Sequence, residues 1–271
     1  MRAQCVMLCC VVLCLLFFAP SAGADQVGPV KWSQLPRMDE YGYNFSSETS
    51  VGSMVADDYL CVDPLAVIDL HWWGSYYMPV VLYPYKNSDN HPDPTIDDDQ
   101  PPGILQGFNI EFYKDIPAGV DPLMPWSHPG TELYHEFIPI TDVTEAYYGT
   151  VVHIGEIEEN VWQYNADLPI PFPQGEYPDP QDIDGDGTLD GTVFWLKIQA
   201  VHDDPDIQWG WHEADSLWHD NAVQHWGPTP EPSEWILIEV KDMAFELSIV
   251  PEPSLLLVAA LGLLAVLKRR R

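Results

Sequence analysis

Short apolar stretches with a period of two residues constrain the fold of this chain more than any other feature. In each stretch, every second residue is apolar and the stretch is bounded by Gly, Pro, Asn or Asp. Because side chains alternate between the faces of a strand, this pattern predicts β-strands with one buried face. The predicted inward-facing sets are Ala66, Ile68, Leu70 and Trp72; Phe108, Ile110 and Phe112; Phe194, Leu196, Ile198 and Ala200; and Phe245, Leu247 and Ile249.

Helix patterns are nearly absent, so the remaining ordered segments are also expected to be strands. Further strand candidates are 54–62, 78–83, 131–138, 150–154, 161–168, 207–212 and 235–240. Together they predict one domain over 25–250, an antiparallel β-sandwich of the jelly-roll type. Two segments rich in Pro and Asp, 84–103 and 169–191, are expected to be long exposed loops between strands.

Residues 1–24 have the three parts of a secretory signal peptide: a cation, a short apolar run and small residues that end with Ala22 and Ala24. We expect export through the secretion translocon and cleavage between Ala24 and Asp25. An uncleaved anchor is disfavoured because the run is too short to span a bilayer comfortably. Four of the five cysteines lie in this segment. The mature monomer keeps Cys61 alone and is therefore expected to have no internal disulfide.

The segment 251–271 ends the chain with three features in a fixed order. A Pro-Glu-Pro motif comes first, an apolar run over 255–267 is predicted to be a membrane helix, and cations follow that favour the cytoplasmic side. The motif and the cations are Pro251, Glu252, Pro253, Lys268, Arg269, Arg270 and Arg271. The apolar run is short for a permanent span, although an ordinary tail anchor is the alternative.

This tail resembles the tripartite PEP-CTERM sorting signal of Gram-negative bacteria. The resemblance implies that an exosortase, a membrane-embedded cysteine transpeptidase, recognises the tail at the inner membrane. It also implies delivery to the cell surface or the extracellular matrix after processing.

The charge of the chain is strongly acidic, with a formal net charge of −31 at pH 7. Nucleic acid is excluded as a partner, because binding to phosphates requires cations that displace counterions. An acidic surface instead suits divalent cations or simply keeps the protein soluble.

A candidate calcium loop lies in the second acidic segment. Its ligands would be Asp182, Asp184, Asp186, Thr188 and Asp190, with Gly185 at the sixth loop position and Val193 at the twelfth. This spacing resembles the first nine positions of an EF-hand or dockerin loop, in which alternating carboxylates on a tight turn converge on one Ca²⁺ ion. The loop departs from that pattern at Val193, where a bidentate Glu is expected. The alternative is a solvated hairpin loop.

The segment 209–226 is rich in Trp, His and acidic residues, and it permits three interpretations. Exposed indoles that stack on sugar rings would make a polysaccharide site; the candidate contacts are Trp209, Trp211, Trp218 and Trp226. Alternatively, His212, Glu213 and His219 would hold Zn²⁺, although their spacing is not diagnostic. The third interpretation is that the indoles are structural and fill the core of the sandwich and its rim.

Catalytic motifs give little support to an enzyme. Asp57 and Asp58 form a possible carboxylate pair for glycoside chemistry, but we expect them to hydrogen-bond turn backbone beside a strand. The sequence lacks the nucleophile-elbow, zinc-protease and phosphate-loop motifs. No catalytic residue is therefore assigned.

Several motifs together resemble an uncharacterised family of secreted domains of unknown function from planctomycete-like bacteria, over residues 31–249. The motifs include WSQLP, VADDYLC, IDLHWWGSY, FNIEFYKDIP, VWQYN, TVFWLKIQA and WHDNAV. The resemblance implies no activity. The expected function is that of a non-enzymatic protein of the cell envelope or matrix that binds calcium and extracellular polysaccharide. The alternative is a secreted carbohydrate-active enzyme with carboxylates near 209–226.

Overall fold

The computed structural model describes residues 28–78, 83–84, 101–154, 157–204, 206–227 and 234–249. These residues form fifteen β-strands and two short 3-10 helices, η1 (Ile140–Asp142) and η2 (Gln174–Glu176), which confirms the all-β prediction. The predicted signal peptide and sorting tail lie outside the described residues. Within the described ranges, no helix is long and apolar enough to cross a membrane.

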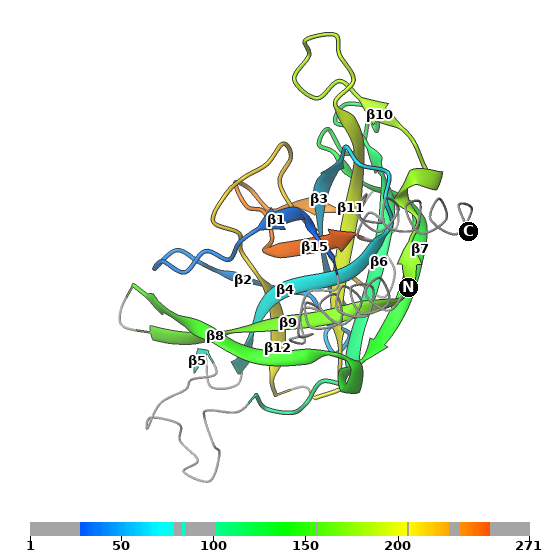
Figure 1. Ribbon diagram of the computed structural model, residues 1–271. Coiled ribbons are helices and arrows are strands. Elements are labelled where there is room, and N and C mark those ends of the chain that lie inside the picture. Colours follow the sequence, from blue (N-terminus) through cyan, green and yellow to red (C-terminus); the bar gives the residue numbers. More distant parts are fainter. Residues whose placement is uncertain are drawn as a thin grey trace, which may run out of the picture.

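The strands form two sheets in which every strand pair is antiparallel (Figure 1). The eight-stranded sheet contains β1 (Val30–Gln34), β2 (Asn44–Ser46), β4 (Val67–Met78), β5 (Tyr83–Pro84), β8 (Thr144–His153), β9 (Ile157–Phe172), β12 (Gln208–His212) and β15 (Phe245–Ile249). The seven-stranded sheet contains β3 (Ser53–Cys61), β6 (Gly107–Ile116), β7 (His128–Pro139), β10 (Pro180–Gln181), β11 (Gly191–Val201), β13 (Val223–Trp226) and β14 (Ile236–Leu237).

The main core lies between the two sheets and is built largely from aromatic rings. Trp72 of β4 meets Phe108 of β6 edge-to-face, with 4.9 Å between ring centroids. Phe112 of β6 stacks on Phe172 of β9 at 4.3 Å. Such ring pairs add to the free energy gained by burying apolar area and hold the sheets face to face. The inward-facing sets predicted for β6 and β11 are confirmed, because all of their members are buried in this core.

The prediction for the start of β4 is wrong at two positions. Leu70 and Trp72 are buried as expected, whereas Ala66 and Ile68 are only half-buried and Val67 is completely buried. The register of β4 shifts between Val67 and Asp69 on both of its neighbours, β9 and β15. An extra residue in a strand reverses which side chains face the core, and the sequence alternation continues unchanged across it.

The predicted loop over 169–191 is also partly wrong. Strand β9 continues to Phe172, which is completely buried, and β10 pairs with β11 further along the segment. Pro169 and Pro171 cannot donate to the ladder, and the register of β9 on β4 shifts between the partners Asp167 and Phe172. The free energy gained by burying the Phe172 ring therefore outweighs the loss of the ladder hydrogen bonds that the two prolines cannot donate.

One other strand differs from expectation, and two predicted segments are largely undescribed. The strand expected over 235–240 is reduced to the two residues of β14, which pair with β13. Most of the acidic segment 84–103 and of the strand expected over 78–83 lies outside the described residues.

Candidate functional sites

The acidic loop between β10 and β11 projects beyond the sandwich at the top of Figure 1. One carboxylate oxygen each from Asp182, Asp184 and Asp190 lies within 4.8 Å of the others. Gly185 and Gly187 have φ angles of 74° and 89°, in the left-handed region that favours glycine. The chain therefore turns tightly enough for three carboxylates to face one point.

Hydrogen bonds between carboxylates and backbone order this turn. Asp182 accepts from the Gly187 amide at 2.9 Å and Asp184 accepts from the Asp186 amide at 3.0 Å. Asp186 accepts from the Thr188 amide at 2.7 Å, and its carboxylate is not part of the converging group. Val193 is buried within β11, so the twelfth loop position supplies no ligand. The geometry suits a hard cation held by three carboxylates, with other oxygens completing its shell.

Two of the four predicted glycan contacts are wrong, because Trp209 and Trp211 on β12 are completely buried. The Trp209 indole donates to the Tyr164 hydroxyl at 3.1 Å, and the Trp211 indole donates to the Ala244 carbonyl at 2.9 Å. A Cβ atom at Gly74 would lie 2.3 Å from the Trp209 ring, so only glycine fits beside it. These indoles belong to the core, as one of the three interpretations of this segment states.

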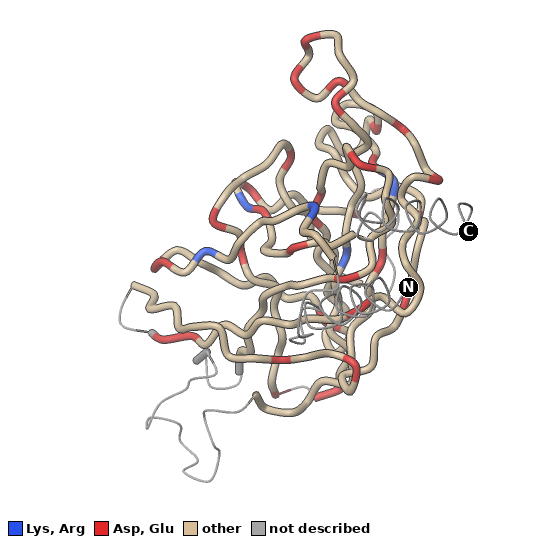
Figure 2. The backbone as a smooth tube through the Cα atoms, viewed as in Figure 1, with Lys and Arg blue, Asp and Glu red and all other residues tan. Residues whose placement is uncertain are grey.

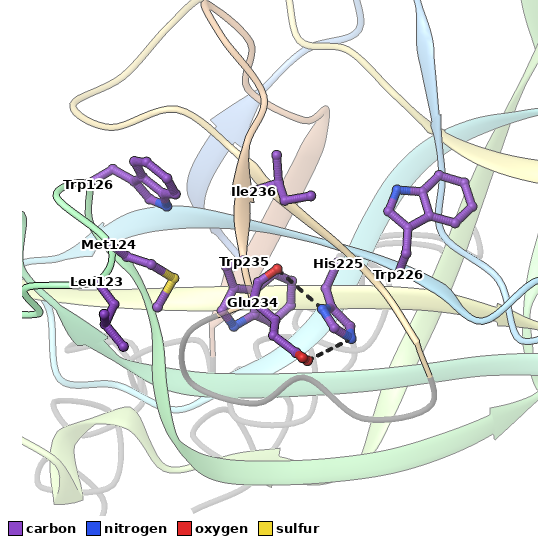
Figure 3. Close-up of a pocket in the computed structure, with 8 residues that line it drawn as sticks. All are labelled: Leu123, Met124, Trp126, His225, Trp226, Glu234, Trp235 and Ile236. Atoms are coloured by element: carbon purple, nitrogen blue, oxygen red, sulfur yellow. Dashed lines mark hydrogen bonds and ion pairs between the residues drawn. The ribbon is translucent and has the colours of Figure 1, made fainter.

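The other two predicted tryptophans remain accessible. Trp218 is half-buried and meets Trp32 edge-to-face at 4.9 Å, whereas Trp226 at the end of β13 is 53% exposed. Trp226 lines an open groove of about 420 Å³ (Figure 3). The groove is lined by Leu123, Met124, Trp126, His225, Trp226, Glu234, Trp235 and Ile236.

The groove combines apolar walls with a few polar atoms. Three of its lining residues are tryptophans, and Leu123 and Ile236 are more than half exposed. The His225 ring lies between Trp235 and Trp226 in Figure 3 and contacts Glu234, with 3.3 Å from Nδ1 to the Glu234 carbonyl oxygen. The sequence pattern did not identify Trp126 or Trp235, because each is an isolated Trp outside the Trp-rich segment.

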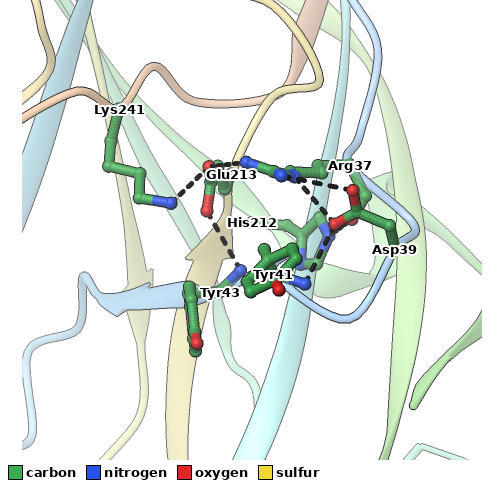
Figure 4. A network of polar contacts seen from close by, with 7 residues as sticks. All are labelled: Arg37, Asp39, Tyr41, Tyr43, His212, Glu213 and Lys241. Carbon is green, nitrogen blue, oxygen red and sulfur yellow. Dashed lines mark hydrogen bonds and ion pairs between the residues drawn. The ribbon is translucent and has the colours of Figure 1, made fainter. Parts of the chain in front are cut away.

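The zinc interpretation of His212, Glu213 and His219 is wrong. The His212 ring already contacts Asn44 at 3.0 Å and the Arg37 carbonyl oxygen at 2.8 Å. Glu213 pairs with Arg37 at 3.2 Å and with Lys241 at 2.5 Å (Figure 4). Burial lowers the pKa of His212, which keeps its ring neutral. His212 and Glu213 therefore form a structural polar network that ties β12 to the N-terminal segment, and His219 lies apart from it, beside Asp58 and Asp220.

A buried acidic cluster lies where β13 stops pairing with β3. The last pair joins Val223 to Ala56, and the next two residues of β3 are Asp57 and Asp58. Both carboxylates are completely buried, as is that of Asp242. Both residues lie within β3 and not beside it, and the expected hydrogen bond to connecting backbone is formed by Asp57, which accepts from the Met243 amide before β15. Successive side chains of a strand point to opposite faces, so the two carboxylates meet different partners.

Asp57 shares a hydrogen-bond network with Asp242. The Gln34 amide lies 3.3 Å from a carboxylate oxygen of each residue, and the Met243 amide donates to Asp57 at 2.7 Å. The Trp218 amide donates to Asp242 at 2.5 Å. Burial raises the pKa of Asp57 well above its usual range, and the charges of Asp242 and Asp58 raise it further. Burial also raises the pKa of Asp242, to about 7.

Asp58 faces an imidazole and a fourth carboxylate. The His219 Nδ1 atom lies 3.4 Å from an Asp58 oxygen and 2.9 Å from an Asp220 oxygen. Burial raises the pKa of Asp58, whereas its hydrogen bond with His219 opposes that rise. Hydrogen bonds with Asp220 and Asp58 raise the pKa of His219 to about 10. The cluster therefore joins residues that are far apart in the sequence and that pattern analysis did not combine.

Acidic residues predominate along the whole described chain, as they do in the acidic loop and the buried cluster. Lys and Arg are sparse among many Asp and Glu residues along the backbone (Figure 2). A second acidic group, formed by Glu111, Glu132 and His135, includes a neutralising partner, because Lys197 Nζ lies 2.6 Å from Glu111. That group is best explained as a structural ion pair.

The fold and these sites together define an acidic all-β protein of two antiparallel sheets, with an aromatic groove and an acidic loop. A family model described as a domain of unknown function (DUF7901) matches residues 30–248, and the chain therefore belongs to that family. This confirms the predicted domain of unknown function over 31–249. No curated protein and no solved structure matches the chain.

Proposed function

We propose that this chain is an exported, jelly-roll-like β-sandwich protein of the cell envelope or extracellular matrix. It binds polysaccharide through the aromatic groove and Ca²⁺ through the acidic loop, without catalysing a reaction. The observation that carries the proposal is the groove of about 420 Å³ with the exposed Trp226 at its rim. Exposed indoles offer flat apolar faces that stack on sugar rings, while the exposed carboxylate of Glu234 supplies oxygen atoms for hydroxyl groups.

The charge of the protein restricts the type of polysaccharide. A net charge of −31 repels anionic polymers at low ionic strength, so uncharged glycans are the favoured ligands. The same repulsion argues against nucleic acid as a partner.

Binding to a panel of uncharged polysaccharides tests the groove. We expect Trp226→Ala to weaken binding by about tenfold, because the substitution removes both the apolar area that the indole buries against the sugar and its stacking face. Tyr147→Ala is a matched control, because it removes a half-exposed ring outside the groove. A blank panel with the intact protein, or equal binding by Trp226→Ala, would overturn the proposal.

Calcium is expected to raise the melting temperature. With a dissociation constant typical of extracellular calcium modules, about 10 mM Ca²⁺ should raise it by about 3–10 °C. Asp184→Ala combined with Asp186→Ala should abolish the rise, whereas Asp203→Ala with Asp206→Ala, at exposed positions elsewhere, should leave it intact. Thermal scans with and without chelator give the measurement. An unchanged melting curve in the intact protein would end this part of the proposal.

Delivery by an exosortase rests on the likeness of residues 251–271 to a PEP-CTERM signal. Deleting residues 268–271 should release or mislocalise the protein, because the terminal cations hold the helix at the inner membrane. Replacing the three arginines by lysine preserves the charge and is the matched control. Cell fractionation measures the result, and normal surface retention of the deletion variant would count against this assignment.

The buried acidic cluster favours one alternative, a secreted carbohydrate-active enzyme. Burial raises the pKa values of Asp57, Asp58 and Asp242, and such carboxyl groups can act as general acids near neutral pH. Asp220, beside them, lies within the Trp-rich segment 209–226. Turnover of a glycan panel, lost in Asp220→Ala, would support this alternative. Absence of turnover on every glycan would exclude it for that panel.

A further inference from the structure

The buried acidic cluster brings four carboxyl groups together beside one imidazole, that of His219. Asp57, Asp58 and Asp242 are completely buried, and Asp220 is beside them. The hydrogen-bond donors described above are mostly neutral amides, and His219 supplies the single imidazole of the cluster. By contrast, the comparable group around Glu111 contains the ammonium group of Lys197. Buried carboxylates are normally paired with cations or with metal ions.

Unsatisfied oxygen atoms mark the same place. Oδ1 of Asp57, Asp58 and Asp242 is buried in each case without a hydrogen-bond partner among the described residues. Leaving a buried carboxylate oxygen unpaired is costly, and a folded protein rarely retains several such atoms together. A cation bound at Asp58 would partner its free oxygen and offset the repulsion among the carboxylates around it.

The donor atoms converge at a distance that suits one metal ion. One atom each of Asp58, His219 and Asp220 lies within 4.8 Å of the other two. Two ligands of a tetrahedral metal, each about 2.1 Å from it, lie about 3.4 Å apart. The observed distance from His219 Nδ1 is 3.4 Å to Asp58 Oδ2 and 2.9 Å to Asp220 Oδ2, so the second pair would separate by about 0.5 Å when both atoms bind the ion.

We propose that Asp58, His219 and Asp220 bind one divalent transition-metal ion, Mn²⁺ or Zn²⁺, at a second cation site distinct from the acidic loop. An imidazole together with carboxylates suits this class of metal, whereas the all-oxygen loop suits Ca²⁺. Asp57 and Asp242 add negative potential behind the ligands. The His219 and Asp220 side chains are 25% and 23% exposed, so the fourth position faces solvent and is open to water.

The conformation of His219 follows from its place in this site. Its φ angle is 53°, in the left-handed region that a residue other than glycine adopts infrequently. This backbone conformation directs the ring toward Asp58 while the adjacent Asp220 reaches the same point. The site thus forms from two consecutive loop residues and one strand residue.

A titration of chelator-treated protein with Mn²⁺, in the presence of excess Ca²⁺, tests the proposal. Calcium occupies the acidic loop, so the electron paramagnetic resonance signal of free Mn²⁺ reports binding elsewhere. The intact protein and Asp184→Ala with Asp186→Ala should each bind one Mn²⁺ ion. Asp58→Asn and His219→Asn should each bind it at least tenfold more weakly, and Zn²⁺ should compete for the site in the intact protein.

Folding of the variants is checked in the same samples. Asp58→Asn removes a buried negative charge, so its metal-free melting temperature should equal or exceed that of the intact protein. Asparagine at position 219 tolerates the left-handed conformation and removes the imidazole. Mn²⁺ binding unchanged in both variants, or lost only when the acidic loop is altered, would overturn the second site. The polysaccharide and calcium proposals would be unaffected by either result.

Discussion

In protein freed of metal by a chelator, the free energy of unfolding should fall as pH rises from about 4 to about 7, and Asp242→Asn should remove much of that fall. The pKa of Asp242 is raised from 3.8 to about 7 in the folded state. A group with a raised pKa stabilises the fold fully below its unfolded pKa, and that stabilisation is lost as pH rises through the folded pKa. A rise in pKa from 3.8 to about 7 corresponds to about 4 kcal/mol at most.

The neighbouring titratable groups also lower the free energy of unfolding as pH rises, each over its own pH range. Asp57 and Asp58 also have raised pKa values, so their contributions are lost as pH rises above the usual range for Asp. The pKa of His219 is raised from 6.5 to about 10, so its contribution disappears between those values. The comparison between the intact protein and Asp242→Asn isolates the part that belongs to Asp242.

Urea unfolding across a pH series measures this effect. Asp186→Asn, which alters an exposed carboxylate of the acidic loop, is the control and should retain the pH dependence of the intact protein. If the difference in unfolding free energy between the intact protein and Asp242→Asn does not change over this range, the carboxyl group of Asp242 is not perturbed as described.

Trp209→Ala should destabilise the domain by about 3–5 kcal/mol, because it removes a large buried ring and leaves a cavity. The Trp209 ring packs edge-to-face on Phe108 and Tyr164, at 5.2 Å and 5.8 Å, and lies directly against Gly74. The substitution also leaves the Tyr164 hydroxyl without its indole donor. The melting temperature and the midpoint of urea unfolding should both fall.

Trp226→Ala is the matched control for this prediction. Its side chain is 53% exposed, so its removal should change stability by less than about 0.5 kcal/mol. The two substitutions thereby separate a core indole from an accessible one within the same segment. Similar stability losses in both variants would contradict the burial described for these residues.

The alternation in β6 and β11 was sufficient to predict which side chains face the core, because period-two patterning is a local property of a strand. The same reasoning was wrong at Ile68, where a register shift reverses the faces without any change in the sequence pattern. It was also incomplete at Phe172, because burial against Phe112 depends on a partner that is distant in the sequence.

By itself, the sequence determined the all-β class, the inward faces of several strands and the acidic loop. These features depend on neighbouring residues: alternation sets the faces of a strand, and closely spaced carboxylates with Gly185 and Gly187 form a turn on their own. The tertiary structure alone decided which indoles are buried and which are accessible. It also decided that Asp58 meets His219 and Asp220, because β13 pairs with β3 only as far as Ala56 and leaves the adjoining strand edge to distant loops.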